Sequence, residues 1–275
     1  MERVHYQQEQ MLDELKDLVD KGLFTEKETK AIMKKRTGFE TALVRRVAKK
    51  ADYLRYAAYE MGLEQLRRKR IARLGIPPGP ATLSDYALVR RQLHIFERAV
   101  KKFKGDVGLW VQYIEVAKRA GARALVGRIT ARALQMHPHT PALFVLAAAH
   151  ELEHHSPSAA RMLLQRGLRL NGESMELWIE YLKMELGFVE SLRRRWEVLG
   201  IKADTSTAIT GEKMEAEAIE EGAAEAEAEF EADAAARARV LEGAIVESVI
   251  SSAGQAVPRV EMFAGMVDVV RGFPL

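Results

Sequence analysis

The sequence contains no cysteine, few turn-forming residues and no long hydrophobic run. Cysteine is absent from all 275 residues, which excludes a disulfide scaffold, a thiolate metal site and a cysteine nucleophile. The 8 prolines and 19 glycines are too few for a loop-rich all-β fold. The apolar stretch 141–149 is about half the ~20 residues that a membrane-spanning helix requires, and residues 1–10 lack the apolar core of a signal peptide. We therefore expect neither a membrane protein nor a secreted one.

Charge is distributed unevenly, although the formal net charge is only +3. Residues 1–119 contain 26 lysines and arginines against 16 acidic residues, whereas residues 200–235 contain 2 against 11. A basic first part can lie close to nucleic acid or an acidic partner, and an acidic segment of this density normally stays solvated.

Bulky residues recur at a spacing of 34 in the middle of the chain. The repeated positions are Trp110, Phe144 and Trp178, then Tyr113, Ala147 and Tyr181 three residues later, and Ala117, Glu151 and Glu185 seven residues later. Positions i, i+3 and i+7 share one face of a helix, so each repeat has an amphipathic helix that buries its aromatic stripe. Residues demanded at every repeat are expected in the core, and Tyr53 and Tyr56 with Glu60 mark an earlier copy.

A second helix is predicted 11 residues upstream of each aromatic residue. Its repeated segments are Arg98-Ala99-Val100, Arg132-Ala133-Leu134 and Arg166-Gly167-Leu168. A pair of helices cannot bury both of its faces alone, whereas stacked pairs can. The sequence therefore predicts an all-α fold, a right-handed α-solenoid of helical-hairpin repeats with an N-terminal helical leader.

The domain organisation follows from this pattern. We expect the helical leader over 1–50, where Thr25 and Glu28 form a capping box, and the repeat array over 51–198, with a loop insertion at 73–84. Residues 199–235 are expected to be an acidic Glu/Ala-rich insertion, either an exposed helix or disordered. Residues 236–275 are expected to hold a further, incomplete helical repeat.

The repeat pattern resembles the half-a-TPR (HAT) repeat of RNA-processing proteins. The leader resembles, more narrowly, the N-terminal region of the sixth family of U-three small nucleolar RNA-associated proteins. The residues that carry this second resemblance are Glu14-Leu15, Gly22-Leu23-Phe24-Thr25, Ala31-Ile32, Lys34-Lys35-Arg36-Thr37, Phe39-Glu40, Tyr56, Tyr59-Glu60 and Leu66-Arg67-Arg68-Lys69-Arg70.

That resemblance implies a non-enzymatic scaffold subunit of the small-subunit processome in the nucleolus, within the nucleus. Its implied partners are the β-propeller (WD-repeat) proteins of the UTP-B subcomplex, with pre-rRNA or small nucleolar RNA nearby in a large ribonucleoprotein assembly. It implies a role in assembling nascent pre-rRNA with the U-three small nucleolar ribonucleoprotein for 18S rRNA maturation and 40S ribosome biogenesis. No cofactor, membrane or small-molecule substrate is implied. The alternative is a HAT-repeat scaffold of a splicing or mRNA 3'-end processing complex.

Clustered basic residues are the candidate contacts for RNA or an acidic partner. They are Arg67, Arg68, Lys69, Arg70 and Arg73, extended by Lys34, Lys35 and Arg36. Such clusters suit the phosphate backbone but cannot by themselves read sequence. A solvated helix face without function, or a nuclear import signal, remains an alternative for the same residues.

One segment also matches a zinc-hydrolase motif, His150-Glu151-x-x-His154, in which two histidines share a helix face and the glutamate activates a metal-bound water. However, Glu151 is also the seventh position after the repeat aromatic residue, equivalent to Glu60 and Glu185. We therefore treat the zinc hydrolase as a remote alternative. No other nucleophile with its base, phosphate-cradling loop or convergent carboxylate pair is recognisable, so no enzyme is expected.

Overall fold

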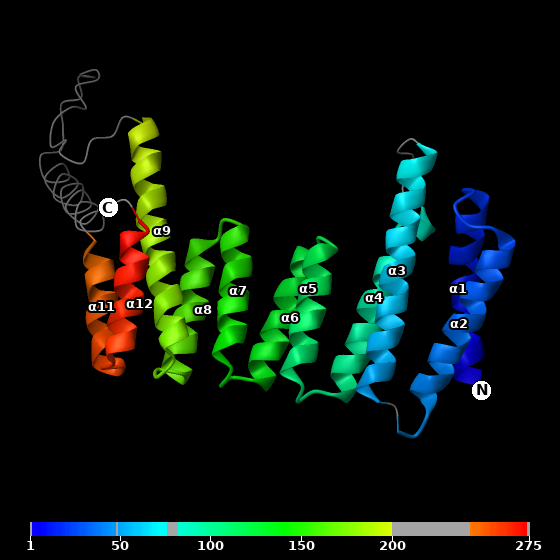
Figure 1. Cartoon of the computed structure of the whole chain (residues 1–275), viewed down its shortest axis with the longest axis horizontal. Helices are drawn as coiled ribbons and strands as arrows, with labels where there is room; N and C mark the ends of the chain where they lie inside the picture. The colour runs from blue at the N-terminus through cyan, green and yellow to red at the C-terminus, as the bar shows by residue number, and fades with distance from the viewer. Residues whose placement is uncertain (1, 48, 76–81, 200–242, 274–275) are drawn as a thin grey trace, which may run out of the picture. The chain divides into compact units, whose positions relative to one another are not determined.

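The computed structural model describes residues 2–47, 49–75, 82–199 and 243–273. Every regular element in these ranges is an α-helix (Figure 1). None of the described helices is long and apolar enough to cross a membrane. The expected all-α helical-repeat solenoid is therefore confirmed as the fold class. The chain divides into two compact units, Met1–His137 and Pro138–Leu275.

The first unit contains six described helices. They are α1 (Glu2–Asp20), α2 (Glu26–Val44), α3 (Lys50–Leu74), α4 (Leu83–Lys102), α5 (Val107–Arg119) and α6 (Arg123–Met136). Helix α1 packs on α2 and α4, α3 packs on α2 and α4, and α5 packs on α4 and α6. Figure 1 shows successive helices running in alternate directions, as short connections between them require.

The connection between α1 and α2 follows local sequence signals. Helix α1 ends at Asp20, and Gly22 adopts a φ of 66°, which a residue with a side chain would rarely occupy. The expected capping box is present. The Thr25 Oγ1 accepts from the backbone N–H of Glu28, and the Glu28 carboxylate accepts from the backbone N–H of Thr25 at 2.9 Å.

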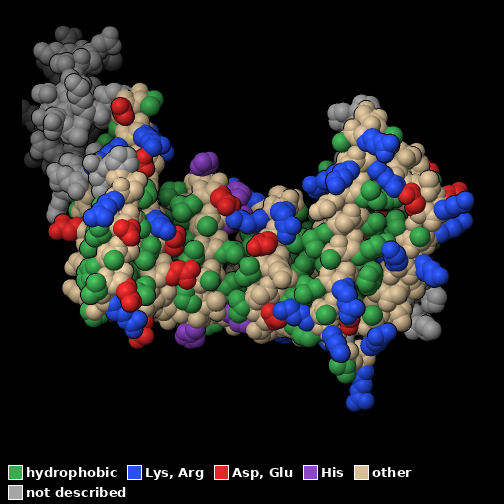
Figure 2. Space-filling view, in the orientation of Figure 1, with side chains coloured by type: hydrophobic (Ala, Val, Ile, Leu, Met, Phe, Trp, Pro, Cys, Tyr) green, Lys and Arg blue, Asp and Glu red, His purple; other side chains and the backbone are tan. Residues whose placement is uncertain are grey.

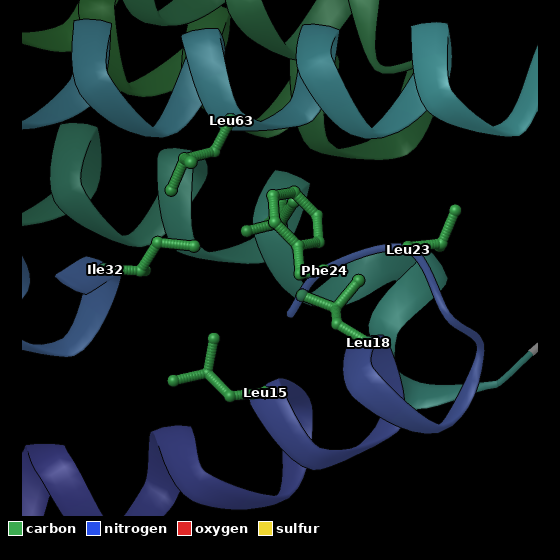
Figure 3. Packing of buried hydrophobic residues seen from close by; sticks show 7 residues of the cluster. Leu15, Leu18, Leu23, Phe24, Ile32 and Leu63 are labelled. Carbon is green, nitrogen blue, oxygen red and sulfur yellow. The ribbon is translucent and has the colours of Figure 1, made fainter. Parts of the chain in front are cut away.

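The leader is joined to the repeats by one buried cluster, shown in Figure 3. Leucines of α1 meet side chains of the α1–α2 turn, α2, α3 and α4. The buried members are Leu15, Leu18, Leu23, Phe24, Ile32, Leu63 and Leu88. Burying a side chain of this size contributes about 1.5–3 kcal/mol, so this cluster helps to hold α1 and α2 against α3 and α4.

The second unit contains five described helices. They are α7 (Pro141–Glu153), α8 (Pro157–Leu170), α9 (Met175–Leu199), α11 (Ala244–Ala256) and α12 (Val260–Arg271). Helix α8 packs on α7 and α9, and α11 and α12 pack on α9 and on each other. Prolines occupy the first turn of α7 and α8, where their missing N–H has no intrahelical partner to lose. The expected acidic insertion lies outside the described residues, apart from Leu199.

Candidate RNA and partner interface

The eight basic residues expected to contact RNA or a partner divide into buried and exposed side chains. Arg36 and Arg67 are buried, and Arg70 is partly buried. The exposed members are Lys34, Lys35, Arg68, Lys69 and Arg73. A run that looks uniform in sequence is therefore split by helix phase, because neighbouring residues of a helix point in different directions.

Arg36 is not available to a ligand, contrary to the expectation. Its Nε and Nη2 each donate to a carboxylate oxygen of Glu60 at 2.7 Å, and both side chains are fully buried. The Arg36 Nη1 lies 3.7 Å from a carboxylate oxygen of Glu14, which also accepts from Arg91 at 2.8 Å. Two arginines and two glutamates from α1, α2, α3 and α4 thus balance one another in the interior.

Arg67 and Arg70 are also occupied within the fold. Arg67 donates to both carboxylate oxygens of Glu64 and to Asp85 at 3.1 Å, and its hydrogen bonds to Glu64 raise the pKa of its guanidinium. Arg70 donates to the Leu23 carbonyl at 2.7 Å and to the Glu28 carboxylate, and its guanidinium lies 4.6 Å from the Phe24 ring centroid. These two arginines fasten α3 to α4 and to the leader.

The five exposed residues, which we call the exposed basic group, remain as surface charges on α2 and α3. These two helices pack together, and the Lys35 Nζ lies 5.3 Å from the centroid of the Tyr59 ring on α3. Arg68 pairs with Glu64 at 2.7 Å but keeps 63% of its side chain exposed. Figure 2 shows lysine and arginine side chains gathered over the part of the first unit that holds α1 to α4.

A small cleft lies beside the exposed basic group, between α3, α4 and α5. Met61, Val89 and Val116 give it apolar walls, while Arg68 and Arg119 supply positive charge. The side chains of these two arginines are 63% and 67% exposed. The cleft therefore combines apolar walls with charges of both signs, because Arg68 pairs with Glu64, which also lines the cleft, and Arg119 lies 4.0 Å from Glu115.

The residues expected in the repeat core lie as follows. Tyr53, Tyr56, Trp110, Tyr113, Phe144 and Tyr181 are buried, and Trp178 is partly buried. The two tryptophans make the same hydrogen bond, because each indole N–H donates to the carbonyl six residues earlier, Lys104 at 3.0 Å and Gly172 at 2.9 Å. Burial raises the pKa of the Tyr113 hydroxyl to about 12. These aromatic side chains fill the interior and do not present a stacking platform for bases.

The glutamate seven residues after the repeat aromatic residue forms an ion pair that the sequence analysis did not predict. Glu60 accepts from Arg36, and Glu185 accepts from the Nε and Nη2 of Arg161 at 2.6 Å. Both arginines stand 24 residues before their glutamate. The equal spacing is a signal that could have been found, since it gives the glutamates of two repeats the same bidentate partner.

The segment that matched the zinc-hydrolase motif gathers a different carboxylate. His150, Glu153 and His154 have ligand atoms within 4.8 Å of one another, and Glu151 is not part of this group. The two imidazole rings lie 4.4 Å apart between centroids. A hydrolase would use Glu151 as its general base, whereas the carboxylate that lies beside the two histidines is that of Glu153.

Comparison with known proteins identifies relatives of this chain. Residues 8–91 match the family described as U3 small nucleolar RNA-associated protein 6. The protein of that name from Schizosaccharomyces pombe is 44% identical over 199 residues, which are 72% of this chain and 41% of that protein. The Mus musculus and Homo sapiens homologues are 37% and 35% identical, over 68% and 69% of this chain and 31% and 32% of theirs. The chain thus spans less than half the length of these relatives.

A solved structure also aligns with most of the chain. It is described as the crystal structure of YrrB, a TPR protein with an unusual peptide-binding site, and it covers 82% of this chain and 94% of that chain at 12% identity and a TM-score of 0.35. The relatives found by sequence share more of their residues with this chain, at 44%, 37% and 35% identity. Over the residues that they match, this chain is similar to U3 small nucleolar RNA-associated protein 6, and the expected resemblance to that family is confirmed.

Proposed function

We propose that this protein is a non-enzymatic scaffold subunit in ribosome biogenesis. It would act in the small-subunit processome of the nucleolus, where nascent pre-rRNA is assembled with the U3 small nucleolar ribonucleoprotein for 18S rRNA maturation. The observation that carries the proposal is the 44% identity over 199 residues to a protein named for its association with U3 small nucleolar RNA. The helical-repeat fold supports a scaffold role, because stacked helical pairs offer extended surface for partners.

The exposed basic group is the proposed contact with RNA. Lys34, Lys69 and Arg73 are exposed charges on neighbouring helices, and interfaces between proteins are depleted in lysine. A lysine-rich helix surface is better suited to phosphate groups, which attract positive charge irrespective of base sequence. RNA contact here would therefore be electrostatic and sensitive to salt, with sequence specificity supplied by other components of the assembly.

Partner proteins would bind beside this surface, at a site that shares Arg68 with it. We propose that the cleft between α3, α4 and α5 accepts an acidic segment of a WD-repeat subunit. Its apolar walls, Met61, Val89 and Val116, can bury an aliphatic side chain of such a segment, and the exposed ends of Arg68 and Arg119 can pair with its acidic groups.

Crosslinking and affinity purification of the full chain from cells test this proposal. Recovery of U3 small nucleolar RNA with nucleolar WD-repeat proteins is expected. Recovery of splicing or mRNA 3'-end processing factors without them would refute it and favour the alternative HAT-repeat scaffold.

A matched pair of charge-reversal variants tests the RNA surface. Reversal of three residues of the exposed basic group should weaken RNA crosslinking. It should also make the crosslinking less sensitive to salt, because up to three contacts with phosphate groups are lost. The test variant changes Lys34, Lys69 and Arg73 to Glu, and the control changes the exposed Lys101, Lys102 and Lys104 to Glu. Equal crosslinking of the two variants would refute the assignment of this surface.

A further inference from the structure

The C-terminal end of α7, with its C-cap residue His154, brings three metal-ligand side chains together. His150, Glu153 and His154 are spaced i, i+3 and i+4, so they share one face of the helix. One ligand atom from each lies within 4.8 Å of the other two. Tetrahedral Zn²⁺ has ligand distances of about 2.0–2.2 Å, which separates its ligand atoms by about 3.3 Å. Side-chain rotations that shift the ligand atoms by about an ångström would therefore bring them to the separation that an ion requires, with no movement of the backbone.

A hydrogen bond sets the His154 ring in the form that binds metal. The His154 Nδ1 lies 2.8 Å from the backbone carbonyl oxygen of His150. Since a carbonyl oxygen can only accept, Nδ1 carries the proton and Nε2 of the neutral ring keeps its lone pair. Metal-binding histidines in proteins commonly donate their second ring nitrogen to a backbone carbonyl in this way, which fixes both the tautomer and the direction of the ring.

The surroundings also suit a cation that arrives from solvent. The group lies at the C-terminal end of α7, where the carbonyl ends of the helix dipoles favour positive charge. His150 is buried, His154 is partly exposed and Glu153 is exposed, so the site has an anchored side and an open side. His155 then adopts a φ of 57° and the chain turns into α8, which fixes the end of the helix.

We propose that His150, Glu153 and His154 bind one divalent transition-metal ion, with Zn²⁺ as the best match. Two imidazole nitrogens and a carboxylate oxygen suit zinc, copper or nickel, whereas magnesium and calcium prefer oxygen ligands alone. Three protein ligands leave the fourth tetrahedral position for water. The site goes beyond the scaffold function proposed above and does not revive the hydrolase, because Glu151 lies outside the group. The bound ion would stabilise the C-terminal end of α7.

Zinc titration of the full chain tests the proposal, after any bound metal has been removed with a chelator. We expect one Zn²⁺ per chain by calorimetry and a higher midpoint of thermal unfolding in its presence, because an ion that binds the folded state stabilises it. His154→Ala and Glu153→Gln change exposed or partly exposed side chains and should leave the fold intact. Each should weaken zinc binding by at least about tenfold, since loss of even an outer partner of a ligand has that effect.

Two controls within the same region complete the test. His139→Ala removes an exposed histidine outside the group, and Glu151→Gln removes the carboxylate of the hydrolase motif. Both should bind zinc as the unchanged chain does. Binding that survives in His154→Ala, that disappears in His139→Ala, or that is absent from the unchanged chain would each overturn the proposal. Cobalt(II) substitution adds a spectroscopic test, because a tetrahedral site gives strong visible absorption that His154→Ala should abolish.

Discussion

Replacement of Glu60 by leucine should severely destabilise the first unit. The side chains of Arg36 and Glu60 are both 0% exposed and joined by two hydrogen bonds of 2.7 Å, so Glu60→Leu leaves a guanidinium in the interior without its main counter-charge. Breaking a buried ion pair from one side typically costs about 3–5 kcal/mol. Since domains of this kind have a total free energy of unfolding of about 5–15 kcal/mol, this one substitution would remove a large share of it.

The equivalent pair in the second unit provides the matched comparison. Glu185 is fully buried, but the Arg161 side chain is 28% exposed and can be rehydrated when its partner is lost. Glu185→Leu should therefore cost about 1–2 kcal/mol, less than Glu60→Leu, because water replaces part of the lost interaction. Urea unfolding followed by far-UV circular dichroism measures both costs.

A double variant separates the buried charge from a general packing defect. Arg36→Met combined with Glu60→Leu removes both charges and leaves apolar side chains of similar length, an exchange that is often neutral or stabilising. We expect it to recover most of the stability lost in Glu60→Leu. A cost below about 1 kcal/mol for Glu60→Leu, or a double variant no more stable than the single one, would refute the reasoning.

Three further predictions concern single side chains. Hydrogen bonds from Arg70 lower the pKa of Glu28 from 4.5 to about 2, so the charged form of Glu28 stabilises the fold fully above pH 4.5 and progressively less as the pH falls towards 2. Glu28→Gln should therefore reduce the loss of stability between pH 4.5 and pH 2. The same loss in the variant as in the unchanged chain would contradict this. Gly62→Ala, in the middle of α3 with nothing within 4 Å of the new Cβ, should raise stability by about 0.5–1 kcal/mol in urea unfolding, and a loss would show that the position is constrained. Gly167→Ala would place its Cβ 2.9 Å from the Phe144 Cγ and should cost about 1–3 kcal/mol in urea unfolding, and an unchanged stability would show that the ring can shift without loss of packing.

The sequence was sufficient to predict the helices and most of the buried aromatic residues. A spacing of 34 between bulky residues reflects packing between neighbouring helices, and each helix carries its own signal in the period of its apolar positions. The capping box of Thr25 and Glu28 is likewise a short-range signal, and the structure confirms it. Local patterns of this kind need no knowledge of distant segments.

The burial of some basic residues could be predicted from the sequence, but their ion-pair partners could not. Arg67 follows Tyr53, Tyr56, Glu60 and Leu63 at spacings of three and four, so its phase on α3 already placed it on the buried face. The cluster was instead interpreted by its charge. By contrast, the pairing of Glu14 with Arg91 joins residues 77 apart, and no local pattern could have predicted it. The metal-ligand group was missed because the familiar motif drew attention to Glu151, whereas helical spacing places Glu153 beside both histidines.

The charge pairs between the leader and the repeats also constrain how the chain folds during synthesis. When α1 and α2 leave the ribosome, the counter-charge of Arg36 is still 24 residues away, that of Glu40 is 58 away and that of Glu14 is 77 away. Arg36 and Glu14 can approach each other within the leader, but Glu60 is supplied by α3, and Arg91 and Arg98, the partners of Glu14 and Glu40, are supplied only by α4. We expect a nascent chain that stops before α4 to remain sensitive to protease, and one that includes α4 to become resistant in a single step.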